Sequence, residues 1–392
     1  MTRSLVLLLA LVAVAPARAA DPGPPLQAIL AVGKEGAGNT DAAAAWKQLV
    51  ATGPDAIIPT LTAFDTATPA AANWLRSAVS AVADAEQKAK RSLPVEALKA
   101  FVKDTRRQPA ARRIAYELYA TAVPGEATNL LAELVNDPES DLRREAIAER
   151  LARAAKVSPA ALLAAQKELV PFARDRDQLE QLAKALDTAG ERFNKTTHLN
   201  YVTQWLVAGP FDNTDEAGYA KAYPPETQFD AKAEYPGKLG PVAWKAMQSA
   251  DEYGTINLNQ EIGKVKFAVA YAYAVVEAPA ATPVEVRATS PNALQIFLNG
   301  EKIYDRNAYH NGRAADAHVA KGTLKPGRNT VLLKVCQDDQ KQPWTQGWEF
   351  AARISDATGG RVPLQQALTT PTGEPQLVPL GTLKAAPAPE KK

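Results

Sequence analysis

The chain contains very few of the residues that most often carry out chemistry. Its 392 residues include one cysteine, Cys336, and three histidines, His198, His310 and His318. A single cysteine excludes an intramolecular disulfide, and so few histidines leave little material for a metal site. Because Cys336 lies in an apolar strand, we interpret it as a small packed residue. An intermolecular disulfide is a second interpretation for an oxidising compartment.

The common sequence motifs of catalysis are also missing. There is no glycine-rich phosphate loop, no GxSxG elbow and no HExxH pair. The adjacent carboxylates Asp338 and Asp339 suit the chemistry of glycoside hydrolysis or of a structural calcium ion. Neighbours on a strand edge point apart, however, and no spaced ligand set accompanies them. We therefore expect no catalytic residue, no metal and no cofactor.

The N-terminus has the pattern of a secretory signal peptide. Arg3 precedes a short apolar run at 5–14, and Ala17-Arg18-Ala19 fits a small-x-small cleavage site. The run is too short to span a bilayer comfortably, and no later stretch is long and apolar enough to do so. We expect residues 1–19 to be removed on export to the periplasm or the exterior, leaving no transmembrane segment.

Charge argues against nucleic acid as a partner. Cleavage after Ala19 removes Arg3 and Arg18 from the 45 basic residues, which then equal the 43 acidic residues. A broad nucleic-acid surface needs clustered net positive charge, and a neutral chain lacks it.

Composition divides the chain near residue 200. Only seven of the 22 glycines precede that point, whereas four of the six tryptophans follow it, and alanine dominates the first half. Alanine favours helices, and glycine-punctuated aromatic runs favour strands and turns. We predict an N-terminal segment at 20–40, a helical-repeat domain at 41–190, a linker at 191–200, a β-sandwich at 201–358 and a flexible tail at 359–392.

The helical half shows apolar residues at helical spacing, interrupted by short polar links. Thr68-Pro69 and Ser158-Pro159 place a capping residue before a proline at the first helical position. The most telling stretch is 136–146, NDPESDLRREA, an Asp-Pro turn followed by an arginine-bearing helix. This pattern resembles HEAT-like α-solenoid repeats, which implies a surface for a protein partner. An irregular helical bundle of the same composition is the alternative.

The β half is organised around residues 283–339. Alternating apolar residues at 284–289 and 294–298 predict strands with one buried face, and 331–335 predicts another short strand. Asn299-Gly300 predicts a two-residue hairpin turn, and Pro326-Gly327 predicts a second turn. By the same alternation we assign Tyr271, Tyr273 and Trp348 to the core.

Two of these segments carry a family resemblance. LNGEKI at 298–303 and LKPGRNTVLL at 324–333 resemble the galactose-binding-like jelly roll, and are similar to the accessory sugar-binding domain of family 2 glycosidases. The resemblance implies a sandwich whose loops often bind carbohydrate. No catalytic barrel follows, so glycosidase activity is not implied. The predicted fold is thus multidomain, a HEAT-like helical-repeat domain followed by an antiparallel β-sandwich of the jelly-roll type.

Two polar loops of the predicted sandwich contain the candidate ligand contacts. Sugar recognition needs an aromatic face for the C–H side of the ring and planar polar groups for its hydroxyls. The loops supply eight such residues: Arg306, Tyr309, His310, Asn311, Arg313, Asp338, Asp339 and Trp344. Ordinary solvent-facing loops are the alternative interpretation.

Three functions follow from this pattern, in order of preference. The first is an exported non-catalytic protein that binds a glycan or cell-surface polysaccharide through the jelly roll. The second is a structural or assembly protein whose helical repeats and jelly roll contact other proteins without glycan. The third, well behind, is a hydrolase with an unrecognised site.

Overall fold

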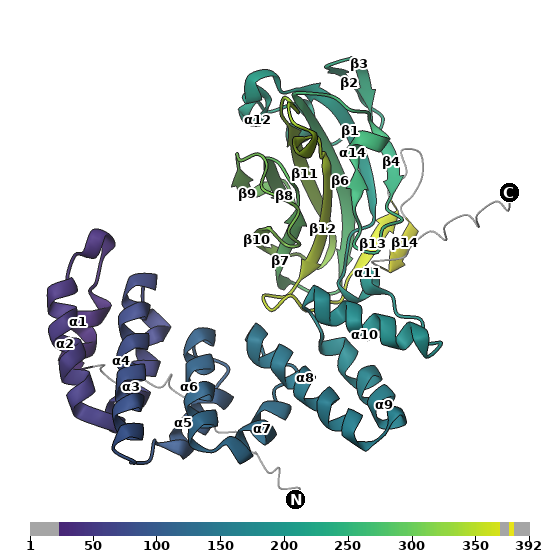
Figure 1. The fold of residues 1–392 in the computed structure, drawn as a ribbon. Coiled ribbons are helices and arrows are strands. Elements are labelled where there is room, and N and C mark those ends of the chain that lie inside the picture. The colour runs from purple at the N-terminus through teal and green to yellow at the C-terminus, as the bar shows by residue number, and fades with distance from the viewer. Residues whose placement is uncertain (1–22, 369–375, 380–392) are drawn as a thin grey trace, which may run out of the picture. The chain divides into compact units, whose positions relative to one another are not determined.

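The computed structural model describes residues 23–368 and 376–379, so the signal-like residues 1–19 lie outside the described part. Helices form the N-terminal part and antiparallel sheets the C-terminal part, as the composition predicted (Figure 1). The chain divides into two compact units at Leu142/Arg143. No helix in the described ranges is long and apolar enough to cross a membrane.

The first unit is built from helices joined by short links. Helices adjacent in the sequence pack together, α1 with α2 and α5 with α6. The Thr68 hydroxyl accepts a hydrogen bond from the backbone of Ala71, which confirms the predicted cap. The helices are α1 (Gly23–Leu30), α2 (Asn39–Thr52), α3 (Ile57–Ala63), α4 (Pro69–Lys88), α5 (Val95–Lys103), α6 (Pro109–Ala122) and α7 (Pro124–Ala132).

A buried ion pair ties the Asp-Pro turn of the first unit to an earlier helix. Arg112 of α6 donates to both carboxylate oxygens of Asp137, at 2.6 and 2.5 Å, and also to the Val102 carbonyl. Asp137 in turn accepts from the backbone of Glu139. The Asp-Pro turn, which carried the resemblance to helical repeats, is therefore held in place by a buried ion pair.

The second unit contains helices as well as sheets, so its limits differ from the predicted 201–358. Helix α8 (Ser140–Val157) crosses the boundary between units, and α9 (Pro159–Leu169), α10 (Arg176–Thr188) and α11 (Lys195–His198) follow it. The predicted linker 191–200 thus holds α11 and four buried residues, Lys195, Thr196, Leu199 and Asn200. Arg176 of α10 stacks 3.8 Å from the Tyr253 ring centre, which joins this helix to the sandwich.

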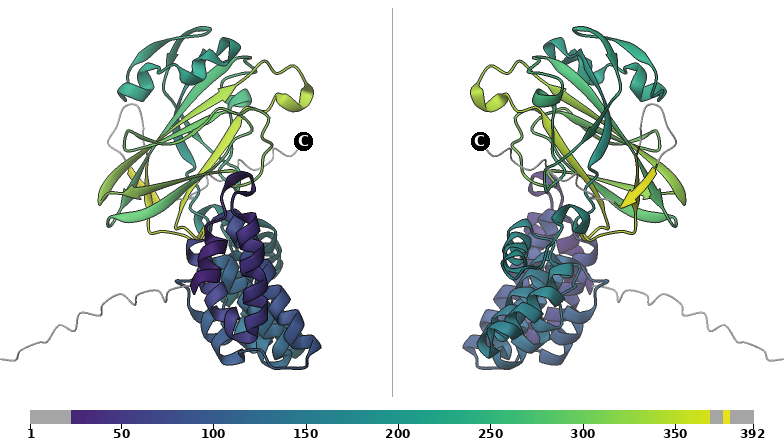
Figure 2. Two further views of the ribbon diagram at one scale, coloured as in Figure 1. Left: turned by 90° about the vertical axis from the view of Figure 1, so that its left-hand side faces the viewer. Right: turned by 90° about the vertical axis from the view of Figure 1, so that its right-hand side faces the viewer.

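Two antiparallel sheets pack face to face around the main core (Figure 2). The larger sheet contains β1 (Gln204–Asp212), β4 (Lys245–Gln248), β6 (Ala268–Ala278), β8 (Leu294–Leu298), β9 (Glu301–Arg306), β11 (Gly327–Gln337), β13 (Gln365–Leu368) and β14 (Gln376–Pro379). The smaller contains β5 (Ile256–Asn257), β7 (Thr282–Thr289), β10 (His318–Leu324) and β12 (Glu349–Ser355). Because β6, β8 and β11 alternate with β7, β10 and β12 between sheets, the sandwich has the arrangement expected of a jelly roll.

Strand β6 is buried on both faces. Its alanines and Val276 line the core between the sheets, where Trp348 is completely buried. Its tyrosines, Tyr271 and Tyr273, face a second aromatic cluster on the outer side. That cluster lies under the chain segment 213–244, which holds α12 (Ala217–Ala220), α13 (Pro224–Thr227) and the hairpin β2 (Glu234–Gly237) and β3 (Gly240–Ala243). The three aromatic residues assigned to the core are confirmed as buried.

The predicted turns are confirmed by backbone geometry. Asn299 and Gly300 have φ angles of 54° and 83°, as the primed hairpin turns require, and Gly327 has φ of 79°. The prediction of a flexible tail from residue 359 was wrong where the structure describes it. β13 continues the larger sheet, because Gln365, Gln366 and Ala367 pair with β6. The rest of that prediction, 369–375 and 380–392, falls outside the described residues.

Candidate ligand-binding site

The two polar loops lead into β10 and β12, respectively, and they contact each other through His310. The first loop, 307–317, follows β9, and the second, 338–348, follows β11 and contains a 3₁₀ turn at Pro343–Thr345. His310 Nε2 lies 2.6 Å from Asp338 Oδ2, and the Asp338 side chain is only 7% exposed. The His310 ring also meets the Trp344 indole edge-on, with ring centres 5.1 Å apart. The structure therefore joins His310, Asp338 and Trp344 into one cluster.

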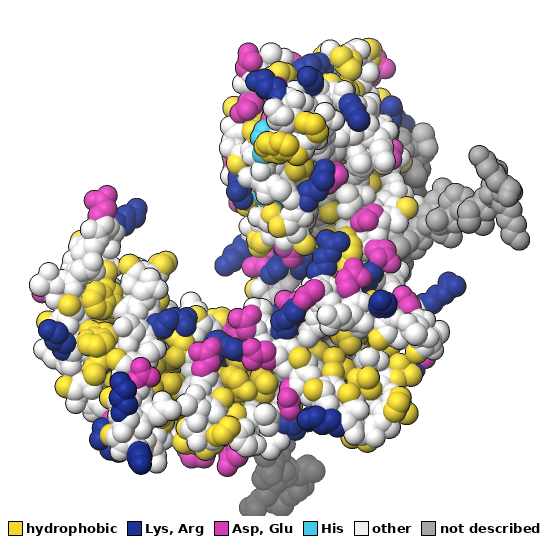
Figure 3. All heavy atoms as spheres, in the orientation of Figure 1, with side chains coloured by type: hydrophobic (Ala, Val, Ile, Leu, Met, Phe, Trp, Pro, Cys, Tyr) yellow, Lys and Arg dark blue, Asp and Glu magenta, His cyan; other side chains and the backbone are white. Residues whose placement is uncertain are grey.

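Trp344 is exposed although it is large and apolar. Its exposed fraction is 71%, the same as that of Leu239 at the tip of the β2–β3 hairpin. Figure 3 shows histidine atoms at the surface of the sandwich with hydrophobic and basic side chains beside them. The contact with His310 is edge-on and most of the indole is exposed, so at least one face of the ring is free. Such a face suits an apolar partner surface.

A buried amide network supports the two loops from below. The Asn292 amide donates to Gln337 Oε1 at 2.6 Å and to the Gly347 carbonyl at 3.1 Å. Asn292 Oδ1 accepts from the His310 backbone, and Gln337 Oε1 accepts from the Asp338 backbone. His310 adopts a left-handed φ of 59°, which is sparsely populated outside glycine. These bonds hold His310 and Asp338 at fixed positions.

Tyr309 is directed inward. Its hydroxyl accepts from the Asn213 amide at 3.0 Å, and Asn213 also donates to the Gln337 carbonyl. Burial raises the pKa of Tyr309 above its usual value. Of the eight predicted contacts, Tyr309 is thus the one that points into the sandwich, where its hydroxyl ties the loop to Asn213.

The remaining predicted residues form local pairs around the cluster. Arg306 donates to Asn311 Oδ1 at 3.2 Å, and it makes no ion pair within the described residues. Arg313 lies 2.5 Å from Glu349, with its guanidinium over Gly347, where any side chain would collide with it. Asp339 lies 2.6 Å from Lys341. The hydrogen bond from Lys341 lowers the pKa of Asp339.

The cluster combines a histidine–carboxylate pair with an exposed indole. Nε2 of His310 faces the Asp338 carboxylate at hydrogen-bond distance and therefore donates a hydrogen bond to it. Burial raises the pKa of the neighbouring Cys336 thiol to about 12, so it is a poor nucleophile at neutral pH. The described residues contain no group of three or more His, Cys, Asp or Glu side chains placed to hold a metal ion.

Sequence reasoning missed Asn213, Asn292 and Gln337, the amides beneath the loops. All three are buried, although Asn213 and Gln337 each lie in a run of polar residues that the sequence alone would place at the surface. No local pattern predicts that three amides so far apart in the chain meet.

Comparison with known proteins identifies no family. No protein-family model and no curated protein matches the chain. Among solved structures, a beta-glucosidase from Kluyveromyces marxianus in complex with glucose aligns over 38% of this chain and 16% of its own, with 14% identity and a TM-score of 0.24. A family 35 carbohydrate binding module from an environmental isolate aligns over 26% and 72%, with 13% identity and a TM-score of 0.18.

An anti-sigma factor domain-containing protein from Clostridium clariflavum aligns over 47% of this chain and 48% of its own, with 11% identity and a TM-score of 0.22. The chain spans less than a fifth of the beta-glucosidase, at 16%. Likenesses of this size establish neither a shared fold nor a shared activity.

Proposed function

We propose that this chain is an exported, non-catalytic binding protein in which HEAT-like helical repeats accompany a galactose-binding-like jelly roll that binds carbohydrate. The HEAT-like assignment is supported by the buried pair of Arg112 with Asp137 at the Asp-Pro turn. Export to the periplasm or the exterior is supported by the signal-like sequence at 1–19. The binding half of the proposal is supported by Trp344 and its surroundings.

The observation that carries this proposal is that an exposed tryptophan lies beside a histidine that is paired with a buried carboxylate, Asp338. A free indole face can stack on the apolar C–H side of a pyranose ring. His310 and Asp338 are held by the amide network, so the polar atoms beside the ring are preorganised. Nδ1 of His310, the Arg306 guanidinium and the Asn311 amide are the groups available to sugar hydroxyls.

A glycan array with the purified full chain tests this proposal. We expect binding to at least one polysaccharide or oligosaccharide, and Trp344→Ala to weaken it by about tenfold or more, as for a central aromatic contact. Leu239→Ala is the matched control, because Leu239 is equally exposed on the same sandwich. It should leave binding unchanged. If the unaltered protein binds no glycan, the carbohydrate proposal fails.

A second candidate function, assembly through protein contacts, is favoured by a recess in the first unit. This recess of about 640 Å³ lies on α2 and α4, and it is lined by Asn39, Thr40, Ala43, Ala44, Lys47 and Trp74. An apolar floor with polar edges suits a protein segment. Cross-linking that recovers one partner in fixed ratio, and loses it with Trp74→Ala but not with Trp344→Ala, would favour this function.

A further inference from the structure

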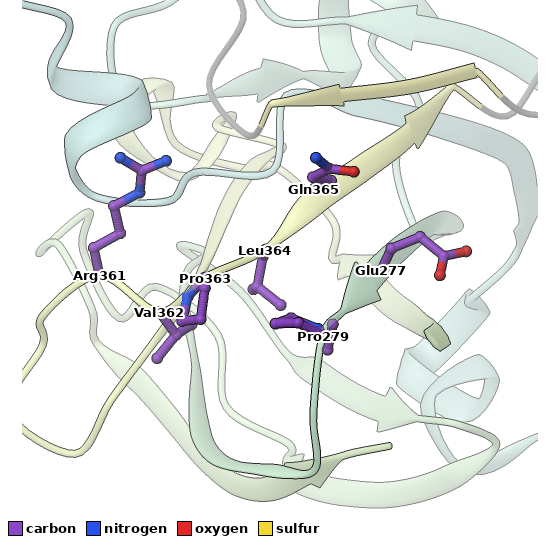
Figure 4. A pocket seen from close by; sticks show the side chains of 8 residues that line it. Glu277, Pro279, Arg361, Val362, Pro363, Leu364 and Gln365 are labelled. Carbon is purple, nitrogen blue, oxygen red and sulfur yellow. The ribbon is translucent and has the colours of Figure 1, made fainter. Parts of the chain in front are cut away.

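The sandwich has a second feature that the loops do not explain, a cavity at one end of the sheets. Its volume is about 700 Å³, which is within the range of small-molecule sites. It is lined by the end of β6 and by the segment that leads into β13. Figure 4 shows Val362, Pro363, Leu364 and Pro279 together, with Arg361, Gln365 and Glu277 around them on three sides.

Two prolines explain why the cavity opens there. Strands β6 and β13 are paired as far as Gln365 opposite Glu277. The same register, continued by two residues, places Pro363 opposite Pro279. Neither proline has an N–H to donate, so the ladder cannot continue between them. The strands part at this point, and a gap forms beside the last pair.

The gap reaches the core between the sheets. Arg361 forms an isolated antiparallel β-bridge with Ser355 of β12 in the smaller sheet. The carbonyl of Val362 accepts a hydrogen bond from the Asn200 side-chain amide. The segment 361–365 therefore passes from the smaller sheet to the larger one. Val362 and Leu364 belong to the inter-sheet core and are 5% and 6% exposed. The floor of the cavity is therefore formed by core side chains, and it favours an apolar occupant.

The rim of the cavity is polar and asymmetric. The Arg361 guanidinium has one hydrogen bond, from Nε to Asn200 Oδ1, and forms no ion pair within residues 23–368. Glu277 likewise forms no salt bridge there, and it lies on the opposite side of the apolar floor (Figure 4). A guanidinium binds a carboxylate in a planar, two-pronged geometry, whereas Glu277 repels a second negative charge.

We propose that this cavity binds a small amphipathic carboxylate, a linear or aromatic molecule with one acidic group. The apolar body lies on Val362, Leu364 and Pro279, and the carboxylate pairs with Arg361. The Gln365 amide is placed to donate a further hydrogen bond to the same acid. This site is separate from the Trp344 cluster, and its ligand is recognised without any sugar.

Calorimetric titration of the full chain with decanoate tests the assignment. We expect saturable binding of one decanoate per chain, and decanol, which has the same apolar body without the charge, to bind at least about tenfold more weakly. Arg361→Gln should weaken decanoate binding by about tenfold or more. Arg192→Gln, an exposed arginine of the same unit that does not line the cavity, should leave it unchanged.

A second variant tests the floor of the cavity. Leu364→Trp fills the space and should abolish binding, provided that its unfolding midpoint shows a folded protein. Arg361 is exposed, so Arg361→Gln still tests the carboxylate contact if Leu364→Trp does not fold. Trp344→Ala should bind decanoate normally, which separates this site from the glycan proposal. No saturable binding of decanoate, equal binding of decanol, or unchanged binding by Arg361→Gln would each overturn the assignment.

Discussion

Two buried cations show how differently the two units are held together. Arg112 in the first unit and Lys334 in the second both have side chains that are 0% exposed. Arg112 bonds Asp137, which is 25 residues away, whereas Lys334 bonds Glu226, which is 108 residues away. Both therefore meet the same physical demand, that a buried charge be paired and hydrogen-bonded, over very different chain separations.

The difference in separation reflects how each unit is assembled. In stacked helices each element contacts mainly its neighbours, so stability is a sum of local terms. In the sandwich, Lys334 Nζ also donates to the carbonyls of Tyr219 and Lys221, and so fastens a distant segment over the outer face of β11. Removal of the buried cation should therefore destabilise only neighbouring helices in the first unit. In the second unit it should free a segment that is distant in the sequence.

The strongest test of this contrast is Arg112→Ala. The change leaves the Asp137 carboxylate and the Val102 carbonyl buried without their donor, so we expect unfolding free energy to fall by about 3–5 kcal/mol. Hydrogen exchange should show lost protection in α5, α6 and α7. Lys103→Ala, which removes an exposed ion pair with Glu133 in the same unit, should cost about 1 kcal/mol or less. Loss of protection throughout the second unit would contradict a local role.

The matching test in the sandwich is Lys334→Met. Met has a similar length but no charge, and Glu226 keeps only the Tyr271 hydroxyl as a described donor, so we expect a loss of about 3 kcal/mol. Exchange protection should fall first in the segment 217–227. The double variant Lys334→Met/Glu226→Gln removes the buried charge as well, and should recover part of the loss. A double variant no more stable than the single one would show that the pair is not the cause.

This contrast also explains what could be predicted from the sequence. Helix limits follow from nearby residues, and the caps at Thr68 and Ser158 form the expected bonds to Ala71 and Ala161. The Asn299-Gly300 turn is equally local. These features depend on backbone preferences within a few residues, so periodicity and turn chemistry are enough to find them.

Long-range contacts could not be predicted in the same way. Nothing near Lys334 indicates that the segment 213–244 covers it, and nothing near Gln366 indicates that β13 pairs with β6. The candidate loops were found from composition, but the contact of His310 with Asp338 depends on both strand order and the amides below. The prolines at 279 and 363 are ordinary loop signals until the register places them opposite each other.

Alkaline pH offers a third way to distinguish the two units, because most tyrosines are in the second unit and their ionisation should destabilise it. Burial raises the pKa of Tyr201 from 10.0 to about 12, and burial also raises the pKa values of Tyr219 and Tyr271. The folded state holds these protons more tightly than the unfolded state, so their contribution is complete below pH 10. It is lost as pH rises through the folded-state pKa values.

We expect Tyr201 alone to account for a loss of about 2 kcal/mol of unfolding free energy between pH 10 and 12, from the shift in its pKa. Urea unfolding monitored across this range, with tyrosinate absorbance, measures it. Tyr201→Phe should show a shallower decline than the unaltered chain. An identical decline in both would mean that Tyr201 does not hold its proton through burial.

The smallest expected effect is that of Trp344→Ala, which is measured against Trp348→Ala in the same stretch of the sandwich. Trp348 is 0% exposed in the inter-sheet core, and Trp348→Ala should cost about 3–5 kcal/mol. Trp344, four residues earlier, is 71% exposed, so Trp344→Ala should change the unfolding free energy by less than about 0.5 kcal/mol. Chemical denaturation of both variants measures the difference. A loss above about 1 kcal/mol for Trp344→Ala would mean that the indole fixes the loop through His310, and reduced glycan binding by that variant would then report loop order instead of a stacking contact.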